Sequence, residues 1–217
     1  MRINKQDYRF FEWEEVPIFV EEREKLKQSI LKRHPRLKNF YKFFNERERL
    51  FYKSRFMVIF SNRCCYCGVS FLRVLNGSNV QIDHIYSKSN NDKSFDINAI
   101  ENLAPSCNVC NSRKSNIVKT KSFAKKISPY TLSGVFERTN DFSIRVSNAF
   151  VHDKDIVSFY NALNLASEFY RLSYFYEYFV IWLINCRHLV STNNYYRLMI
   201  IAFILGEIVR SNANYHR

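Results

Sequence analysis

Four cysteines in two Cys-x-x-Cys pairs are the residues of this sequence with the clearest capacity for chemistry. The first pair is Cys64 and Cys67, and the second is Cys107 and Cys110. Each pair can present two thiolates to one metal ion, and two pairs complete the tetrahedral thiolate set that Zn²⁺ favours. Since four thiolates leave no open coordination position, the spacing predicts a structural zinc site.

The other two cysteines, Cys65 and Cys186, are expected to be small buried residues. Cys65 could replace Cys64 only with a single residue between it and Cys67. The first residues of the chain are charged and polar and lack the apolar segment of a signal peptide. Cysteines in an unsecreted protein favour metal ligation over disulfides, so the expected location is cytoplasmic.

Polar residues between and after the cysteine pairs form a second group: Asp83, His84, Asn102, Asn111 and Lys114. Taken singly, each has an ordinary explanation. A lone histidine is usually an ordinary buried residue, and an asparagine is often a turn or capping residue. Two Cys-x-x-Cys pairs that flank an Asp-His pair and an asparagine at these spacings are far more specific than any single member.

The segment from about residue 60 to residue 127 resembles the HNH nuclease family, whose core is the ββα-metal fold. The resemblance implies that His84 is the general base and that Asn102 braces the loop behind it. It also implies that Asp83 and Asn111 are the two protein ligands of a catalytic metal. The family more commonly has histidine where this sequence has Asn111.

The chemistry that the resemblance implies is the hydrolysis of DNA phosphodiester bonds. A neutral imidazole can take a proton from water near neutral pH. Carboxylate and amide oxygens suit Mg²⁺ or Mn²⁺, and two protein ligands leave positions for water and phosphate. The expected products carry 5′-phosphate and 3′-hydroxyl ends. A module stapled by zinc that binds nucleic acid without catalysis is the alternative, although such a module would not need both Asp83 and His84.

The charge balance points to a polyanionic partner. The 217 residues include 33 basic and 20 acidic residues, which gives a formal net charge of +13. Nucleic acid is the first partner that such a surplus favours, and an anionic membrane is the second. No apolar run reaches the ~18 residues of a membrane-spanning helix. With 47% hydrophobic and 17% aromatic residues, the composition also argues against disorder, and it indicates either a core filled with rings or exposed stacking surfaces.

The most one-sided charge follows the second cysteine pair. From Asn102 to Phe136 the sequence has basic residues and no acidic ones. We expect a patch here that contacts DNA phosphates, with a solvated basic face as the alternative. The residues expected to bind nucleic acid are Arg113, Lys114, Lys119, Lys121 and Lys125.

The resemblance implies a ββα-metal core with a zinc knuckle, and hydrophobic periodicity predicts that the rest of the chain is mostly α-helical, so the expected class is α+β. Three parts are expected: a basic helical arm over residues 1–60, the nuclease core over 61–127 and a mostly helical extension over 128–217. The arm either packs as ordinary amphipathic helices or lies against nucleic-acid phosphates. Its expected helices are Ile18–Arg33, ended by His34-Pro35, and Leu37–Phe60, with a break near Asn45.

In the core we expect a hairpin followed by a helix. Its strands are Val69–Val74 and Asn79–Ile85, joined by an Asn76-Gly77 turn. The family's helix is expected over Cys110–Lys126. The extension is expected to begin with a short hairpin of strands Phe136–Arg138 and Phe142–Val146. Helices are expected to follow: one from Asp155, and the apolar helices Tyr174–Cys186 and Tyr195–Val209.

The two apolar helices either form their own core or bury against a partner protein or a second copy of the chain. The arrangement of a small HNH core with a helical extension resembles nucleases of bacterial anti-phage systems of the Septu and retron-linked kind. In those systems the nuclease is held by a partner ATPase. A nuclease of a restriction system or a mobile element is the alternative.

Overall fold

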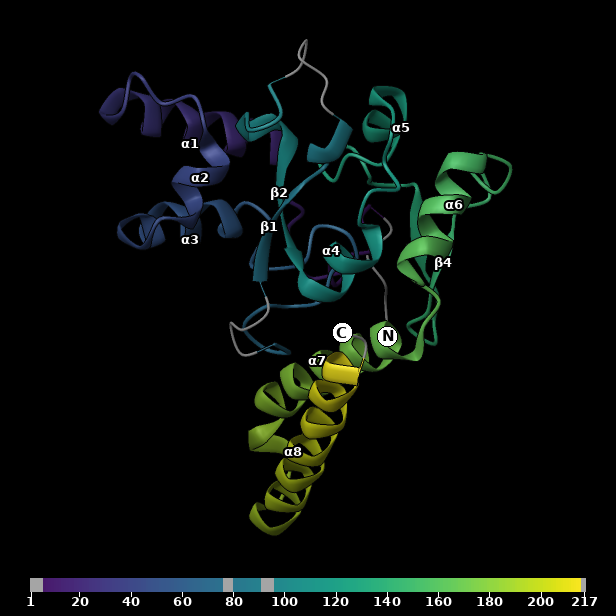
Figure 1. The fold of residues 1–217 in the computed structure, drawn as a ribbon. Coiled ribbons are helices and arrows are strands. Elements are labelled where there is room, and N and C mark those ends of the chain that lie inside the picture. The colour runs from purple at the N-terminus through teal and green to yellow at the C-terminus, as the bar shows by residue number, and fades with distance from the viewer. Residues whose placement is uncertain (1–5, 76–79, 91–95, 216–217) are drawn as a thin grey trace.

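The structure is a computed structural model that describes residues 6–75, 80–90 and 96–215. Within these residues the chain forms eight α-helices and two small antiparallel sheets, which agrees with the predicted α+β class. The sheet of β1 and β2 lies at the centre of the body, with α1, α2 and α3 on one side and α5 and α6 on the other (Figure 1). The hairpin of α7 and α8 projects below this body.

The N-terminal helices end where the sequence indicates. Helix α1 spans Phe19–Arg33 and stops before Pro35, as predicted. Helix α2, Phe40–Asn45, begins after Asn39, whose side chain accepts a hydrogen bond from the backbone N–H of Lys42. The predicted break near Asn45 is confirmed by a 3₁₀ turn over Arg47–Arg49 that precedes helix α3, Leu50–Val58.

The central sheet differs from the predicted hairpin. Strand β1, Val80–His84, pairs with strand β2, Leu103–Cys107, so that His84 lies opposite Leu103. The expectation of a strand over Val69–Val74 is wrong, because this segment forms turns. Val69, Phe71 and Val74 are nevertheless buried, whereas Leu72 is 62% exposed, so the segment contributes to the core without forming a strand. The expected Asn76-Gly77 turn lies outside the described residues.

The helix expected over Cys110–Lys126 is two helices. Helix α4, Asn108–Lys114, ends at Ser115, which has a φ of 39° and so leaves the right-handed helical region. Helix α5, Lys121–Lys126, begins anew after Thr120, whose hydroxyl accepts a hydrogen bond from the N–H of Phe123. The change of direction separates the second cysteine pair from the lysines of α5.

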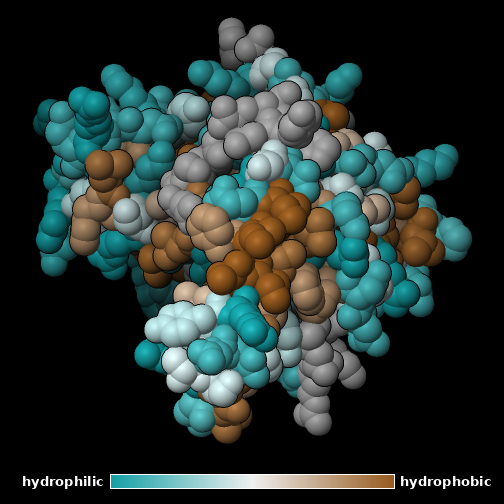
Figure 2. All heavy atoms as spheres, turned by 90° about the horizontal axis from the view of Figure 1, so that it is seen from below, coloured by the Kyte–Doolittle hydropathy of each residue, from teal (hydrophilic) through white to brown (hydrophobic). Residues whose placement is uncertain are grey.

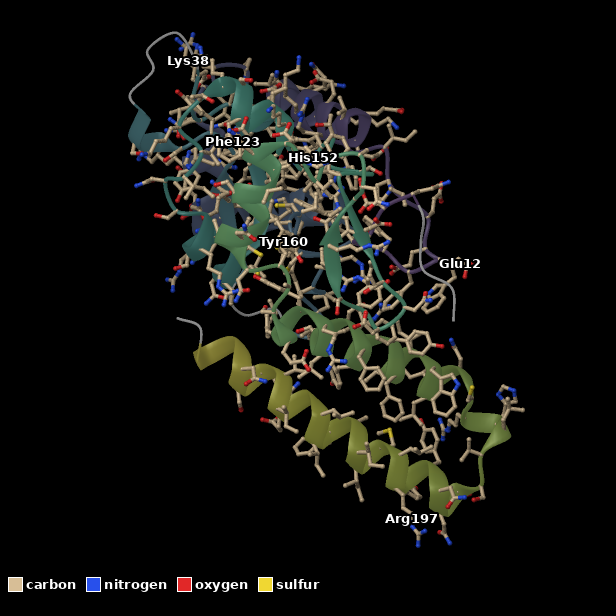
Figure 3. The ribbon with its side chains drawn as sticks, turned by 90° about the vertical axis from the view of Figure 1, so that its right-hand side faces the viewer. Glu12, Lys38, Phe123, His152, Tyr160 and Arg197 are labelled. Carbon is tan, nitrogen blue, oxygen red and sulfur yellow. The ribbon has the colours of Figure 1, made fainter. Side chains whose placement is uncertain are left out.

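The C-terminal part has the predicted hairpin and helices. Strands β3, Phe136–Arg138, and β4, Ile144–Val146, pair in antiparallel fashion. Helix α6, Lys154–Leu163, is capped by the side chain of Asp153. Helices α7, Glu168–Asn185, and α8, Thr192–Tyr215, run side by side as one layer, with Arg197 on the far edge of α8 (Figure 3). None of the helices in the described ranges has the length and hydropathy needed to cross a bilayer.

Buried aromatic rings fill the core, as the composition predicted. Phe19 stacks on Phe60 with their ring centroids 4.8 Å apart, and Phe44 stacks on Phe56 at 4.7 Å. Buried charges also join distant elements, because Arg63 Nη1 donates to Glu177 Oε2 of α7 at 2.8 Å. Arg63 Nη2 donates in addition to Glu14. These ion pairs tie the middle of α7 to the segment that precedes the first cysteine pair.

Helix α8 is apolar on two faces. One face packs on α7 and buries Ala202 and Val209. The opposite face exposes large hydrophobic side chains at helical spacing. Figure 2 views the molecule from below and shows hydrophobic side chains gathered in the middle of this lower side of the molecule. The outer stripe of α8 consists of Tyr196, Met199, Ile200, Phe203 and Ile204, each at least 47% exposed.

Candidate functional site

The first cysteine pair lies in a tight turn. Cys64 N–H donates to the carbonyl of Val69, and Gly68 N–H donates to the carbonyl of Cys64, both at 2.9 Å. Gly68 has a φ of +76°, and a Cβ there would lie 2.7 Å from the Cα of Arg9. Glycine is therefore required for both the backbone conformation and the close approach. The turn directs Cys64 and Cys67 toward the second pair.

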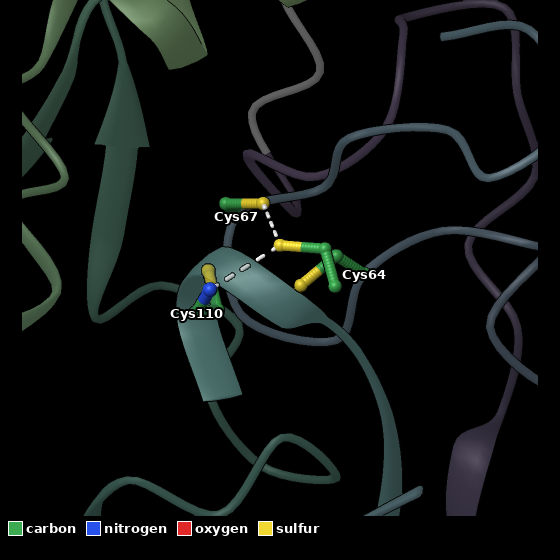
Figure 4. A group of neighbouring side chains, drawn as sticks. Cys64, Cys67 and Cys110 are labelled. Atoms are coloured by element: carbon green, nitrogen blue, oxygen red, sulfur yellow. Dashed lines mark hydrogen bonds between the residues drawn. The ribbon is translucent and has the colours of Figure 1, made fainter. Parts of the chain in front are cut away.

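The second pair begins α4, and the four thiols meet. Cys107 is the N-cap residue of α4, where its Sγ accepts a hydrogen bond from the N–H of Cys110. All four Sγ atoms lie within 4.8 Å of one another, and all four residues are buried (Figure 4). The Sγ atoms of Cys67 and Cys107 are 3.9 Å apart. Tetrahedral zinc with Zn–S bonds of about 2.3 Å requires ~3.8 Å, so the donor set fits a zinc ion.

The thiols have perturbed acidity. Burial raises the pKa of the Cys67 and Cys110 thiols well above the usual value. Burial also acts to raise the pKa of Cys64, but hydrogen bonds from the surrounding thiols outweigh it and lower the pKa. Deprotonation of a whole buried cluster is unfavourable without a cation. A bound dication would stabilise the thiolates and release protons.

Residues of α6 and α7 support the thiol cluster from outside. The hydroxyl of Tyr170 lies 3.3 Å from Cys110 Sγ. Arg113 donates to the carbonyl of Leu163 at 3.0 Å and to the Tyr170 hydroxyl at 3.5 Å. Arg113, which was expected to contact DNA, is therefore half-buried and directed toward the junction of α4 with α6 and α7.

Asp83 faces α4, and both of its side-chain partners contact the same carboxylate oxygen, Oδ2. The Tyr66 hydroxyl donates to Asp83 Oδ2 at 2.7 Å, and Lys114 Nζ lies 3.3 Å from the same atom. Only 7% of the Asp83 side chain is exposed. Burial raises the pKa of this carboxyl above its usual value, although the ammonium of Lys114 and the hydrogen bond from Tyr66 act in the opposite direction.

Lys114 lies inside the fold rather than on the surface. Its side chain is 1% exposed, and Nζ donates to the backbone carbonyl of His84 at 2.9 Å. One ammonium group thus holds both residues of the Asp-His pair, although we expected Lys114 among the DNA contacts. A buried charge is tolerated where it is paired and hydrogen-bonded, as it is here.

His84 leaves β1 on the opposite side from Asp83 because successive side chains of a strand alternate. Its ring lies 4.3 Å from that of Tyr41 in α2, and Nε2 lies 3.2 Å from Asn98 Oδ1. An amide oxygen can only accept, so this hydrogen bond places the proton on Nε2 and leaves Nδ1 as the proton acceptor. Burial lowers the pKa of His84 below its usual value, which keeps the imidazole neutral at pH 7.

Asn102 holds the segment that follows His84. Its Oδ1 accepts from the N–H of Tyr86 at 2.8 Å, and its Nδ2 donates to the carbonyls of Tyr86 and Ile97 at 3.2 and 2.8 Å. The N–H of Ile85 also donates to the backbone carbonyl of Asn102 at 2.8 Å. These contacts fix the chain direction immediately after the Asp-His pair.

Asn111 lies on α4 over the same face of β1 as Asp83. Its Nδ2 donates to Oε1 of Gln81, which is two residues before Asp83 and therefore shares its face. The amide oxygen of Asn111 is thus directed away from Gln81. Asp83 pairs with Lys114 on this face of β1, and Asn111 contacts Gln81 on the same face.

Comparison with known families agrees with this arrangement. The sequence model of HNH endonucleases matches residues 64–116, which include both cysteine pairs and the Asp-His pair. This segment matches the HNH endonuclease family. No curated protein and no solved structure matches the chain. Below, residues 64–116 are called the HNH segment.

The remaining lysines expected to contact DNA lie beyond the HNH segment, in or near α5. Lys119, Lys121 and Lys125 are exposed. Lys126, at the end of α5, is 40% exposed and pairs with Asp153 at 3.0 Å and Asp155 at 2.8 Å. All four lysines thus lie on the surface, and Lys126 pairs with acidic residues at the start of α6.

Sequence reasoning missed the partners of the Asp-His pair. Tyr66 and Gln81 belong to the HNH segment, but an aromatic inside the first Cys-x-x-Cys and an exposed glutamine on a strand carry no chemical signal by themselves. Asn98 was one of several polar residues in a loop. Tyr41 is far away in the sequence, and only the packing of α2 on β1 brings it to His84.

Proposed function

We propose that this protein is a metal-dependent endonuclease that hydrolyses DNA phosphodiester bonds. The observation that carries the proposal is that the HNH segment holds Asp83 and Asn111 on the face of β1 toward α4, and His84 next to Asp83 on the opposite face of the same strand. A folded zinc-binding module would need none of these three residues in this arrangement.

Asp83 and Asn111 would hold the catalytic divalent ion. The contacts of Asp83 with Tyr66 and Lys114 use Oδ2, and a carboxylate has a second oxygen with lone pairs of its own. The amide oxygen of Asn111 supplies the second ligand. These hard oxygen donors suit Mg²⁺ or Mn²⁺, which when bound would stabilise charge that develops on the scissile phosphate.

His84 would act as the general base. Its neutral imidazole, held by Asn98 through Nε2, can accept a proton from the attacking water at Nδ1. Attack on the phosphorus and loss of the 3′ oxygen would leave 5′-phosphate and 3′-hydroxyl ends. Exposed Lys119, Lys121 and Lys125 would hold neighbouring phosphates.

The function is tested by nicking of supercoiled DNA in Mg²⁺, Mn²⁺ and EDTA. His84→Ala should lower the rate about 10²–10⁴-fold because it removes the proton acceptor, while zinc content and DNA binding stay unchanged. Asp83→Ala should also be inactive, but excess Mn²⁺ should partly restore it. Asn111→His should keep activity with a shifted metal preference, because imidazole suits softer ions. If His84→Ala cuts as fast as the wild type, this mechanism is wrong.

A nucleic-acid-binding module without catalysis is the second candidate. The observation in its favour is the state of Asp83, whose buried carboxylate is already compensated by Lys114 at 3.3 Å. A cation next to the carboxylate weakens its attraction for a second cation. Binding of DNA without cleavage under every metal condition would favour this candidate.

We further propose that the protein works in bacterial anti-phage defence and that a partner ATPase covers the outer stripe of α8. Support comes from the stripe itself, where Phe203 is 65% and Ile200 60% exposed. A helix that is apolar on two faces is normally buried on both. The surface lacks charged side chains in its centre, so the partner should offer an apolar helix or groove.

Purification from the native host tests the partner. Phe203→Glu should release an ATPase that the wild type retains, because the change places a charge in the apolar contact. Phe51→Glu is the matched control, since Phe51 of α3 is 62% exposed and lies elsewhere on the surface. Retention of the ATPase by Phe203→Glu, or its absence from the wild type, contradicts the proposal. A wild-type dimer that Phe203→Glu dissociates would assign the stripe to a second copy.

A further inference from the structure

A cavity of about 420 Å³ is lined by the two residues that immediately follow the Asp-His pair. One wall is the segment immediately after β1, with Ile85 and Tyr86, together with Asn102. The other wall is α5, with Lys121, Ala124 and Lys125. Because Ile85 and Tyr86 directly follow His84, whatever occupies this cavity lies close to the proposed point of cleavage.

The inner wall of the cavity is apolar and held in place. Ile85 is 3% exposed, Tyr86 6% and Ala124 8%, so these residues are supported from behind by the core. The side-chain amide of Asn102 donates and accepts hydrogen bonds with backbone groups of Tyr86 and Ile97. The wall therefore keeps its shape and presents the apolar side chains of Ile85 and Ala124 and the ring of Tyr86, with Ser128 and Thr131 completing the lining.

The rim of the cavity is basic. Lys121 and Lys125 are four residues apart on α5, so they lie on the same side of the helix, and both are exposed. The carboxylate of Glu101 at the rim is paired with Lys27 Nζ at 2.6 Å. Two cations above an apolar wall match the chemistry of a nucleotide, which combines anionic phosphates with a flat base.

We propose that this cavity receives one unpaired nucleotide of the DNA next to the scissile bond. This inference rests on the proposed nuclease function. The base would lie against Ile85 and Tyr86, and the adjoining phosphates would contact Lys121 and Lys125. The volume falls within the range of about 300–1,000 Å³ that small-molecule sites occupy.

A preference among DNA substrates follows. A paired base is held in the stack, and moving it into a cavity requires that it first be unstacked and unpaired. A base that is already unpaired, in a bulge, a flap or an overhang, avoids this cost. The preferred substrate should therefore be DNA with an unpaired nucleotide beside the cleavage point, rather than a continuous duplex.

Equilibrium binding tests the cavity separately from cleavage. In the His84→Ala background, a labelled duplex with one bulged nucleotide should bind about 5- to 100-fold more tightly than the paired duplex of the same sequence. Removal of the bulged base, with its sugar and phosphates kept, should abolish the gain. Ala124→Phe, which fills the cavity, should abolish it too while binding to the paired duplex persists.

The rim has a matched pair of variants. Lys125→Ala should reduce the slope of log K against log[salt] by about 0.9 for duplex DNA, because one phosphate contact is lost. Lys126→Ala makes the same change of charge at the next residue, whose ammonium is paired with Asp153 and Asp155. This control should leave the slope unchanged.

Equal affinity for the bulged and paired duplexes would overturn the inference, as would a gain that survives removal of the base. The base-free probe alters only the DNA, so it decides the matter even if the Ala124→Phe protein fails to fold. Binding that prefers the bulge, in a wild-type protein that cleaves nothing, would keep the cavity and remove the nuclease function.

Discussion

At the scale of single residues, strand β1 separates two kinds of chemistry. Asp83 faces α4, where Tyr66 and Lys114 contact its carboxylate and Asn111 contacts Gln81 on the same face of the strand. His84 faces α2 and the loop that carries Asn98. Charge is thereby concentrated on one side of the strand, and a neutral proton acceptor lies on the other. Lys114 connects the sides through the carbonyl of His84.

Replacement of Lys114 with methionine should destabilise the protein strongly. The change keeps the length of the side chain but leaves the Asp83 carboxylate buried without its cation. Loss of one partner of a buried ion pair costs about 3–5 kcal/mol of unfolding free energy. Urea denaturation of Lys114→Met measures this loss. Lys126→Met is the control, and a loss as small as that of this exposed variant would contradict the assignment.

The sequence predicted some of these residues better than others. Short local turns govern the cysteine pairs, so spacing alone was enough to predict that four thiols meet. The partners of Asp83 and His84 depend on long-range packing, which spacing does not encode. Arg113 and Lys114 belong to the same basic run of the sequence as the α5 lysines. The end of α4 at Ser115 separates these two residues, which point into the fold, from the lysines of α5, which are exposed.

At the scale of elements, the cysteine cluster joins the turn at Cys64–Gly68 to β2 and α4. Strand β2 has five residues and pairs only with β1 in the described structure. A two-stranded sheet is marginal by itself, so the cluster must supply much of the cohesion here. The expected strand over Val69–Val74 does not form, and the buried Val69, Phe71 and Val74 instead pack in the turns that follow the first cysteine pair.

Cys107→Ser should abolish zinc binding and cause cooperative loss of the core structure. Four-thiolate zinc contributes folding free energy directly, about 10–16 kcal/mol in small zinc-finger peptides. Cys186→Ser is the control, since Cys186 is half-buried and lies outside the cluster. Elemental analysis and circular dichroism measure the two effects. Folded wild-type protein without zinc would contradict the prediction, as would loss of zinc from the control.

The contact of α1 with the turn before β2 should depend on pH. Burial acts to raise the pKa of Glu101, but the hydrogen bond from Lys27 outweighs it and lowers the pKa from its usual 4.5. A lowered pKa gives stability that is present above the usual pKa and lost as pH falls through the folded-state pKa. At pH 7, Glu101→Gln should therefore have a lower melting temperature than the wild type. The corresponding loss of unfolding free energy should be no more than about 1 kcal/mol, because the ion pair is partly exposed. The two melting curves should converge near pH 3, and a gap that widens in acid would refute the link.

At the scale of the whole molecule, α7 belongs to the body and α8 lies on α7. Glu177 of α7 pairs with buried Arg63, and Tyr170 reaches Cys110. The ring of Tyr174 lies 3.8 Å below the guanidinium of Arg138. Hydrophobic periodicity predicted both apolar helices. It did not predict that α7 packs on the body and α8 on α7, because periodicity identifies an apolar face but not the surface against which that face packs.

Two truncations should therefore differ sharply. A chain that ends at Val190 lacks α8 but keeps Glu177 and Tyr170, so it should retain zinc and nicking activity. A chain that ends at Ala166 also lacks α7 and leaves Arg63 buried without the carboxylate of Glu177, although its contacts with Glu14 and the carbonyl of Gly68 remain. Loss of a buried ion-pair partner on this scale, about 3–5 kcal/mol, should unfold the protein. Thermal melts at low concentration and zinc analysis compare the two, and equal stability would contradict this division.

The alternation along β1 also bears on how such a chain can change in length during evolution. The register of β1 on β2 is pinned where Val80 lies opposite Cys107 and where Asn102 holds the exit after His84. One residue inserted between these points would exchange the faces of the carboxylate and the imidazole, since side chains alternate with a period of two. Insertions before Val80 or after Tyr86 leave the faces unchanged. Homologues of different length should therefore differ in the loops on either side and keep an invariant spacing inside the strand.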